Sequence, residues 1–483
     1  MLPGVRTPGF FVFRDEKKRG TNGQMQGLKQ YGIKEGSCYA VCELLMYLYV
    51  LLLRSRFKYL IILDETFVEY RELKWKGGFY HEEYRYPVAV LGGGSVGRTC
   101  AADCKLGGNT VRLFDIQPFA QQSLKYLEKT GVTLVGHPKN KYGFNRLGNA
   151  KFDLITDNMR EAVDGAKLIL VCIPSVAHDV FFEQLAPLLT DGQIVHIIPD
   201  NYGSLRLRKK LREIHSSADV IIGGWSSAPY GTRIQKEGGV STPEQYLVYR
   251  AITLRGSALP TADSDEFLES TKYLGCFDSI TEGDGPVKGN TVLDIGFSNV
   301  NPVIHVPGTI LGASVMENFG RIYGGHDRFQ YSIYSHAFCP SLSEVQVAFY
   351  EEETALAEKI GVDLARYPKE DFFSRASILG PEYMGEGCIV PFDEQWETGF
   401  TTGPFSIQNR YVTEDVPVGC HVYHELGKKF GVPTPVIDSM ITIASVMVGQ
   451  DFYKTGVTLE DLGISDLSKD ELLTYLNEGV YAG

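Results

Sequence analysis

The feature that most constrains the fold of this 483-residue chain is a glycine-rich sequence, Gly92-Gly-Gly94-Ser-Val-Gly97, which directly follows the apolar run at 88–91. Each glycine has its own physical role: Gly92 makes a tight turn, Gly94 lets the backbone approach a ligand, and Gly97 lets a helix pack closely on a strand. The pattern predicts a strand, a turn and a helix whose N-terminus binds the pyrophosphate of a dinucleotide. The expected cofactor-binding residues here are Gly92, Gly94, Ser95, Val96 and Gly97.

Short apolar runs alternate with segments of helical length in the part of the chain that follows this motif. Residues 95–106 and 176–189 have the length and periodicity of helices, and Gly107 stands where a helix end favours glycine. The apolar runs, which predict buried parallel strands, lie at 88–91, 110–114, 168–172, 193–198 and 220–223. This alternation predicts an α/β domain of the Rossmann type, spanning residues 86–288.

After about residue 288 the pattern becomes mostly helical. One helix is expected from Ser341 to its end at Gly361, and another from Pro435 to Gly449. In the second, an apolar stripe predicts a face buried in the core, formed by Val436, Ile437, Met440, Ile443, Val446 and Met447. Residues 289–483 are therefore expected to form a second, mainly α-helical domain that carries the substrate and catalytic groups.

Residues 1–85 form an N-terminal extension without a recognisable motif. Its apolar run from Leu44 to Leu53 has ten residues, too few to span a bilayer, and it begins too far from residue 1 for a signal peptide. Three interpretations stay open for the extension: an added helical arm, a membrane-surface anchor, or translated sequence upstream of the true start. We expect no stable membrane insertion.

The overall charge and the cysteines narrow the class of protein. A formal net charge of −12 argues against nucleic-acid binding, which needs a basic surface, and favours small-molecule chemistry. The nine cysteines contain no CxxC pair, so neither a zinc knuckle nor a disulfide framework is indicated. These features predict a protein of the reducing cytoplasm.

Two further positions are expected to contact the dinucleotide. Asp115 ends the second predicted strand, 23 residues after Gly92, near the spacing of about 20 residues at which a carboxylate accepts hydrogen bonds from the ribose hydroxyls. This favours NAD(H) over NADP(H); the alternative is a solvated carboxylate at a strand end. Pro174 follows the strand at 168–172, and a loop at that end of a central strand is expected to line the nicotinamide side.

The second half holds the candidate chemistry. His305 stands between Pro302 and Pro307, and because a proline disfavours helical geometry at the preceding residue, we expect His305 at a break in regular structure. A structural histidine is the alternative. Downstream, Arg410 is suited to bidentate recognition of a carboxylate, and Asp415 to orienting an imidazole; the alternative is a surface ion-pair cluster.

Four segments, in this order and at these separations, resemble the octopine/nopaline (opine) dehydrogenase family: GGGSVG at 92–97, VCIPSVAH at 171–178, NPVIHVPGTIL at 301–311 and RYVTEDVPVG at 410–419. The resemblance covers roughly residues 86–465. It implies a Rossmann-type domain followed by a helical domain like the C-terminal domain of 6-phosphogluconate dehydrogenase, with the active site between them. It also implies that His305 is the catalytic histidine, that Asp415 pairs with it, and that Arg410 holds the carboxylate of a 2-keto acid.

The activity so implied is the NAD(P)H-dependent reductive condensation of an amino acid with a 2-keto acid such as pyruvate. A histidine with an ordinary pKa of about 6.5 can donate and accept protons near neutral pH. Asn301 is expected to hydrogen-bond substrate or nicotinamide, or alternatively to cap local backbone. Two other functions stay open: a hydroxy-acid or sugar-phosphate dehydrogenase of the same build, and a non-catalytic protein that senses NAD.

The partners expected are the two small substrates, with a monomer or a homodimer as the assembly. The sequence departs from the family in its N-terminal extension and in the cluster Cys420-His421-Val-Tyr-His424. An HxxH pair suggests a metal, but a third ligand is not evident, so we expect no metal site and a solvated or packed pair of histidines.

Overall fold

The computed structural model describes residues 59–64, 67–72, 86–136, 146–237, 240–251, 253–277, 285–364, 366–373 and 402–483. The chain divides into two compact units, Met1–Tyr80 and His81–Gly483. In the first unit, strands β1 (Tyr59–Asp64) and β2 (Phe67–Glu72) pair antiparallel, so a helical arm is the wrong expectation for these residues. The apolar run at 44–53 lies outside the described residues.

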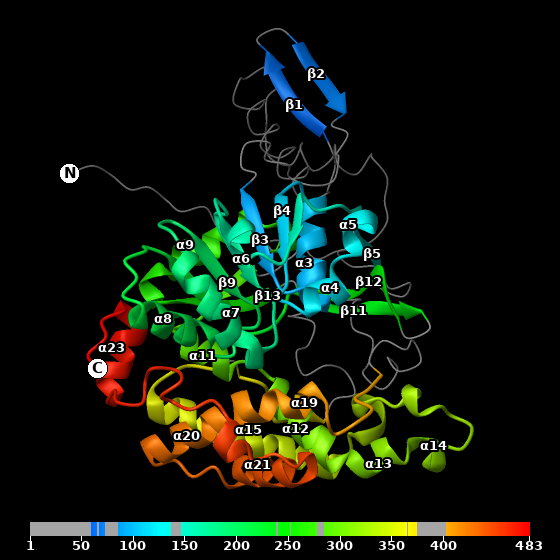
Figure 1. Cartoon of the computed structure of the whole chain (residues 1–483), viewed down its shortest axis with the longest axis vertical. Coiled ribbons are helices and arrows are strands. Elements are labelled where there is room, and N and C mark those ends of the chain that lie inside the picture. Colours follow the sequence, from blue (N-terminus) through cyan, green and yellow to red (C-terminus); the bar gives the residue numbers. More distant parts are fainter. Residues whose placement is uncertain are drawn as a thin grey trace, which may run out of the picture. The chain divides into compact units, whose positions relative to one another are not determined.

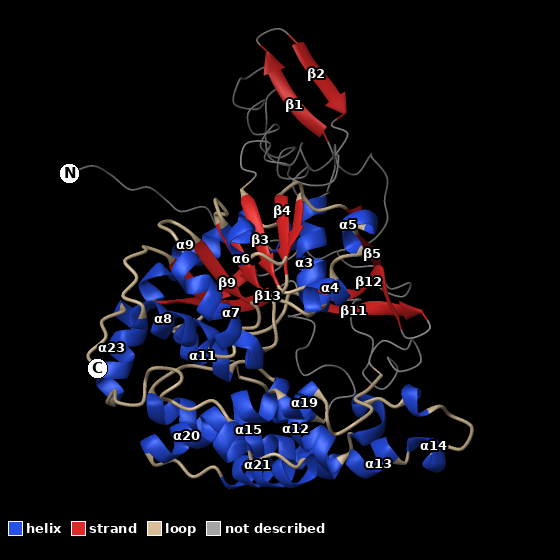
Figure 2. Cartoon of the chain, viewed as in Figure 1, coloured by secondary structure: helices blue, strands red, loops and turns tan. Residues whose placement is uncertain are grey.

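The second unit contains an eight-stranded sheet, drawn in red in Figure 2. Six consecutive strands, from β10 to β7 at one edge, are parallel, and β13 pairs antiparallel with β10 at the other end of this set. In spatial order the strands are β14 (Gly285–Lys288), β13 (Thr253–Leu259), β10 (Ile221–Trp225), β9 (Ile194–Ile197), β8 (Leu168–Val171), β3 (Pro87–Leu91), β4 (Thr110–Phe114) and β7 (Leu154–Thr156). The five predicted strands are all present, and the order is that of a Rossmann-type fold.

Helices cover the faces of this sheet because its central strands are buried on both sides and need a partner layer on each. Helix α3 (Ser95–Leu106) has the predicted bounds, and the predicted helix at 176–189 is divided into η1 (Ser175–Ala177), α7 (His178–Leu185) and η2 (Ala186–Leu188). The other helices of this domain are α4 (Phe119–Ser123), α5 (Leu127–Thr130), α6 (Met159–Val163), α8 (Gly203–Glu213), η3 (Thr261–Asp263), α9 (Ser264–Glu269), η4 (Ser270–Tyr273) and η5 (Gly275–Phe277).

A smaller four-stranded sheet, which we did not predict, contacts α3. Its spatial order is β11 (Tyr230–Glu237), β12 (Val240–Arg250), β5 (Val132–Gly136) and β6 (Gly148–Ala150). Buried polar contacts connect this sheet to helix α3: Asp103 of α3 forms a 2.7 Å ion pair with Arg250 of β12 and accepts a hydrogen bond from Tyr230 of β11. The pairing fixes the sheet on the helix that follows the glycine motif.

The rest of the chain, from Val292 to the C-terminus, is mainly helical in its described part, and most of these helices form the lower layer in Figure 1, whereas the last one lies beside α8 of the Rossmann-type domain. Two predicted helices are confirmed as α15 (Pro340–Ile360) and α21 (Pro435–Val448), which end at Gly361 and Gly449 with φ of 88° and 74°. The others are α11 (Val292–Phe297), α12 (Asn301–Leu311), α13 (Ala313–Glu317), α14 (Phe319–Ile322), η6 (Arg328–Gln330), η7 (Ile333–Ala337), α16 (Lys369–Phe372), α19 (Arg410–Thr413), η9 (Val416–Cys420), α20 (His421–Phe430), α22 (Phe452–Thr455) and α23 (Lys469–Glu478).

His305 does not lie at a break: it is inside helix α12, which continues through Pro307. An internal proline costs a helix about 3 kcal/mol. Burying Val303 and Val306 stabilises the packed helix by about 1.5–3 kcal/mol each, and nearly every other residue of α12 is buried as well. Tertiary packing therefore outweighs the local preference of the proline.

The predicted core stripe of α21 is wrong in part. Ile437 and Met440 are buried as expected, but Ile443 is 40% exposed and Val446 79% exposed. The buried face also includes Ile441 and Ala444, so it is rotated from the predicted stripe. Among the described residues, no helix combines the length and the apolar character that crossing a membrane requires.

Candidate active site

The glycine motif has the geometry that a pyrophosphate-binding turn needs. Gly92 has a φ of +112°, and a Cβ added there would lie 2.4 Å from the carbonyl oxygen of Cys172. A Cβ on Gly97 would lie 1.9 Å from the carbonyl oxygen of Gly92, whereas one on Gly94 would meet nothing within 4 Å. Gly92 and Gly97 therefore allow the close contact between turn, helix and strand, whereas Gly94 leaves open space before the N-terminus of α3. These residues fit a bound dinucleotide.

Asp115 follows β4 and lies beside the turn. Its Oδ2 accepts a hydrogen bond from the backbone N–H of Gly93 at 3.0 Å, and its Oδ1 accepts one from Ile116 at 2.9 Å. The residue is only 9% exposed, so it is not a freely solvated strand end. A carboxylate at this position is the group that accepts hydrogen bonds from ribose hydroxyls in dinucleotide-binding folds.

Ser95 and Val96 begin helix α3 and are half-buried, and the Ser95 hydroxyl donates to Gln245 at 3.2 Å. Pro174 is exposed just beyond β8, the strand next to β3, where the strand order of the sheet reverses. This is the position at which such sheets bind their ligands. His178, the last residue of the VCIPSVAH segment, is fully buried and stacks on Phe182, and burial holds its pKa well below the usual value.

His305 and Asp415 meet although they are 110 residues apart in the sequence. The Nδ1 of His305 lies 2.8 Å from Oδ2 of Asp415, and both residues are buried. The Nε2 faces the hydroxyl of Tyr334 at 3.2 Å, and the ring of Tyr411 stacks on the imidazole with centroids 3.7 Å apart. The imidazole thus has Nδ1 hydrogen-bonded to a carboxylate and Nε2 beside a hydroxyl.

Two π-helices supply the surroundings of this pair. Tyr334 belongs to η7, and Asp415 immediately precedes η9. Such wide turns are often found at functional sites because they displace side chains from the regular helical positions. Neither Tyr334 nor the π-helices left a sequence signal that we recognised, whereas Tyr411 lies inside the RYVTEDVPVG segment and could have been examined as a neighbour of Arg410.

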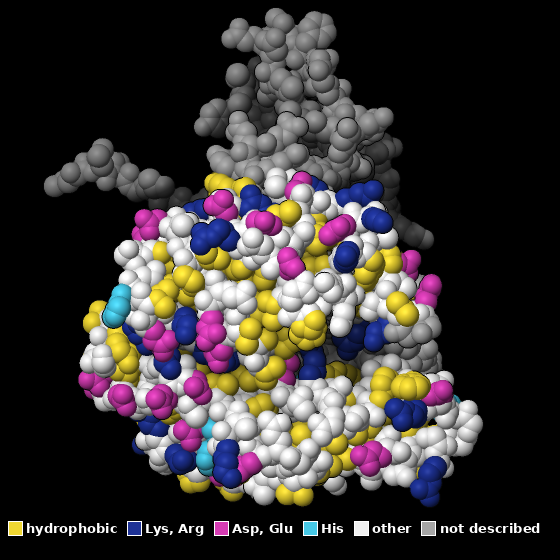
Figure 3. All heavy atoms as spheres, in the orientation of Figure 1, with side chains coloured by type: hydrophobic (Ala, Val, Ile, Leu, Met, Phe, Trp, Pro, Cys, Tyr) yellow, Lys and Arg dark blue, Asp and Glu magenta, His cyan; other side chains and the backbone are white. Residues whose placement is uncertain are grey.

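Arg410 begins helix α19, one turn before Asp415, and is exposed. In the described part of the chain its guanidinium makes no hydrogen bond or ion pair, so the alternative of a surface ion-pair cluster at Arg410 is not seen. Asn301 is the first residue of α12, one turn before His305, and its half-buried side chain makes no hydrogen bond with described residues either; the cap of α12 is Val300. Figure 3 shows lysine and arginine side chains around a hollow between the two domains.

The histidines of the HxxH pair are held by other groups. His421 Nδ1 lies 2.9 Å from the carbonyl oxygen of Val457, and His424 Nδ1 lies 2.8 Å from Oδ1 of Asp438. Across the described ranges, no group of three His, Cys, Asp or Glu side chains is arranged to hold a metal ion.

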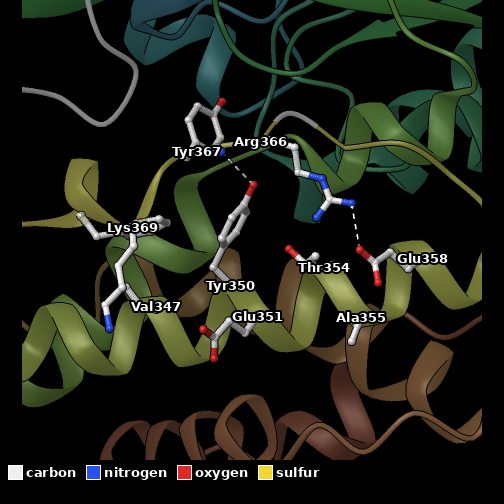
Figure 4. A pocket seen from close by; sticks show the side chains of 10 residues that line it. Val347, Tyr350, Glu351, Thr354, Ala355, Glu358, Arg366, Tyr367 and Lys369 are labelled. Carbon is white, nitrogen blue, oxygen red and sulfur yellow. Dashed lines mark hydrogen bonds and ion pairs between the residues drawn. The ribbon is translucent and has the colours of Figure 1, made fainter.

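A cavity of about 320 Å³ lies elsewhere in the helical domain, between α15 and residues 366–372 (Figure 4). Tyr350 accepts a hydrogen bond from the backbone of Tyr367 inside it, and Arg366 forms an ion pair with Glu358 at 3.2 Å on its rim. None of the predicted site residues lines this cavity.

Two family models match the chain. Residues 288–448 match the α-helical domain of NAD/NADP octopine/nopaline dehydrogenase, and residues 87–199 match the N-terminus of NAD-dependent glycerol-3-phosphate dehydrogenase. Among curated proteins, an opine dehydrogenase of Arthrobacter sp. (strain 1C) is 28% identical over 385 residues, covering 79% of this chain and 96% of that protein. A tauropine dehydrogenase of Arabella iricolor is 22% identical, covering 76% and 93%.

Solved structures have the same fold. Octopine dehydrogenase with NADH and L-arginine aligns with a TM-score of 0.56 and 20% identity, covering 80% of this chain and 98% of that one. Yersinopine dehydrogenase bound to NADP⁺ aligns with a TM-score of 0.55 and 14% identity, covering 81% and 98%. The matched helical domain, the curated relatives and the Rossmann-type fold agree with one another, and the chain belongs to the opine dehydrogenase family of NAD(P)-dependent oxidoreductases.

Proposed function

We propose that this enzyme joins the amine of an amino acid to a 2-keto acid and reduces the resulting imine with NADH. The observation that carries the proposal is the buried His305–Asp415 pair, with Nδ1 and Oδ2 at 2.8 Å. The pair lies in the helical domain, and Glu414, next to Asp415, is hydrogen-bonded to Ser175 of the loop after β8. The acid–base pair is thus tied to the edge of the sheet at which the nicotinamide is expected.

His305 is the proposed acid and base. The amine adds to the keto carbon, the hydroxyl leaves as water, and the imine carbon is then reduced, so protons must leave the amine and reach the departing oxygen. With Asp415 accepting at Nδ1, the neutral ring carries its proton there, and Nε2 is the nitrogen that exchanges protons with substrate. Asp415 also stabilises the imidazolium that forms after proton uptake.

Arg410 is the proposed anchor of the keto acid. Its exposed guanidinium, one helical turn from Asp415, presents a planar fork that matches a carboxylate. Anchoring the carboxylate aims the adjacent keto carbon and converts an encounter of separate molecules into a positioned reaction. Asn301, one turn before His305, is proposed as a further polar contact to substrate or nicotinamide.

The proposed cofactor is NADH, held by Gly92, Gly94, Ser95, Val96 and Gly97, with Pro174 on the nicotinamide side. When bound, NADH supplies the hydride. Asp115 favours NADH over NADPH because a carboxylate beside the ribose repels a 2′-phosphate. The octopine dehydrogenase structures support the substrate classes, since one holds NADH with L-arginine and another NADH with pyruvate.

The test is NADH consumption by the full chain, with 2-keto acids crossed against a panel of amino acids and each component omitted in turn. We expect oxidation that needs both partners. Oxidation with a carbonyl compound alone would instead assign a hydroxy-acid type of reaction, and tight NADH binding without turnover of any pair would assign a nucleotide sensor. Either result would overturn the proposed condensation.

A further inference from the structure

Every polar group of the buried residue Ser175 forms a hydrogen bond, and the partners come from both domains. Ser175, 1% exposed, donates its backbone N–H to Oε1 of Glu414 at 2.8 Å and its hydroxyl to the same oxygen at 2.9 Å. Its hydroxyl also accepts from Asn201 at 2.5 Å, and its carbonyl oxygen accepts from Arg206 at 2.9 Å. Ser175 and Glu414 are 239 residues apart in the sequence.

The polar chain continues to the helix that carries His305. Asn201 accepts a hydrogen bond from Asn299 at 2.5 Å, and Asn299 accepts from the backbone N–H of Asn301 at 3.1 Å. Asn301 is the first residue of α12. The loop after β8 is therefore connected through Glu414 to the segment that carries Asp415, and through Asn201 and Asn299 to helix α12, which carries His305.

Glu414 is placed to fix the positions of Asp415 and Arg410 relative to the loop after β8. It is buried, it adjoins Asp415, and its backbone N–H donates to the carbonyl oxygen of Arg410 at 2.9 Å. Burial, and next the charge of Asp415, raise the pKa of Glu414 above its usual value, so the ionised form needs the donors that Ser175 supplies. A buried carboxylate that loses such donors is strongly destabilised.

We infer that Glu414 is a positioning residue that holds the loop after β8 through its two hydrogen bonds with Ser175, a contact that we call the clasp. The clasp aligns the nicotinamide side of the cofactor site with His305, Arg410 and Asp415. This inference rests on the proposed function for its kinetic consequence, and on the hydrogen bonds alone for the clasp itself. Glu414 does not exchange protons with substrate; it acts through the two residues on its own segment.

The discriminating variants are Glu414→Ala and Glu414→Gln. The glutamine keeps an Oε1 that can accept from both donors of Ser175, whereas alanine removes the acceptor. We expect Glu414→Ala to lower kcat about 10²-fold, as a small misplacement of reacting groups does, with the Kd of NADH changed less than about threefold. Glu414→Gln should stay within about threefold of wild type in kcat, and the exposed Glu460→Ala serves as a matched control.

A second readout does not depend on turnover. In Glu414→Ala, hydrogen exchange should become faster both at the Ser175 amide, which donates directly to Glu414, and at residues 410–415. In Glu414→Gln and Glu460→Ala, exchange at both places should equal that of wild type. Faster exchange confined to residues 410–415 would show a local structural role and would overturn the clasp. Equal impairment of kcat by the alanine and glutamine variants would overturn it as well.

Ser175→Ala removes the hydroxyl but leaves the backbone donor, so it should lower kcat by less than Glu414→Ala does, and it can be measured even if Glu414→Ala does not fold. Where both single variants fold, the double variant should be no worse than Glu414→Ala alone. Independent, multiplicative losses would refute the coupling. If wild type consumes no NADH with any substrate pair, the proposed function fails, while the exchange measurement still decides whether the clasp exists.

Discussion

The Nδ1 of His305 lies 2.8 Å from Oδ2 of Asp415, in a buried contact between helix α12 and the residue that precedes η9. The contact fixes which ring nitrogen faces Tyr334 and which faces the carboxylate. Because Nδ1 is hydrogen-bonded to the carboxylate, the proton exchange that we propose for His305 takes place at Nε2.

Replacing His305 with alanine should lower kcat by about 10²–10⁴-fold, the usual contribution of general acid–base catalysis. The Kd of NADH, measured by fluorescence titration, should change little because the dinucleotide turn is in the other domain. Asp415→Asn should lower kcat by at least about 10²-fold, since an amide that donates to Nδ1 favours the wrong tautomer. Wild-type turnover in His305→Ala would remove its assigned role.

Arg410→Lys should chiefly raise the KM of the keto acid, by about tenfold, with a smaller effect on kcat. The ammonium keeps the charge but lacks the two-pronged fork that matches a carboxylate. Initial rates at saturating NADH and amino acid measure the effect. A KM for the keto acid equal to that of wild type would show that the carboxylate is bound elsewhere.

Substitutions at Gly94 and Gly97 should affect cofactor binding and folding differently. A Cβ at position 94 meets no atom within 4 Å, so Gly94→Ala should keep the melting temperature and raise the Kd of NADH by about tenfold or more. A Cβ at position 97 lies 1.9 Å from the Gly92 carbonyl oxygen, so Gly97→Ala should lower both the melting temperature and NADH affinity. Unchanged NADH binding by Gly94→Ala would place the pyrophosphate away from this turn.

Asp115→Asn should relax the preference for NADH. The amide oxygen can still accept from Gly93, whereas the hydrogen bond from the Ile116 N–H is lost together with the charge that repels a 2′-phosphate. The ratio of kcat/KM for NADPH to that for NADH should rise about tenfold, which corresponds to about 1.4 kcal/mol. A ratio that does not move would mean that Asp115 only supports the turn.

Glu353 should make the folded state less stable as the pH rises. It is 1% exposed, and burial raises its pKa to about 8, although the Tyr423 hydroxyl donates to it at 2.7 Å. Between about pH 4.5 and 8 the folded chain keeps a proton that the unfolded chain has lost, so the free energy of unfolding falls by up to about 1.4 kcal/mol per pH unit.

Glu353→Gln mimics the protonated acid and should remove this dependence. Urea unfolding of both proteins from pH 5 to 8 measures it, and the stability of the variant relative to wild type should increase steadily with pH. A constant difference across this range would show that Glu353 titrates at its ordinary pKa in the folded protein.

The sequence by itself determined the elements whose signals are local. The glycine motif placed β3 and α3, apolar runs placed the central strands, and Gly361 and Gly449 marked helix ends, because each signal reflects the backbone and burial of a few adjacent residues. The sequence also predicted roles for His305, Arg410 and Asp415, since their segments resemble those of one family.

Only the tertiary structure decided how these residues are arranged. Pro307 predicted a break, yet packing keeps α12 helical, and Ile443 and Val446 are exposed because burial on α21 depends on which neighbours the helix has. Likewise, the contacts of His305 with Tyr334 and of Ser175 with Glu414 join segments that are far apart in the chain. Long-range contacts of this kind have no periodic or local signature, because they depend on how whole helices and strands pack against one another.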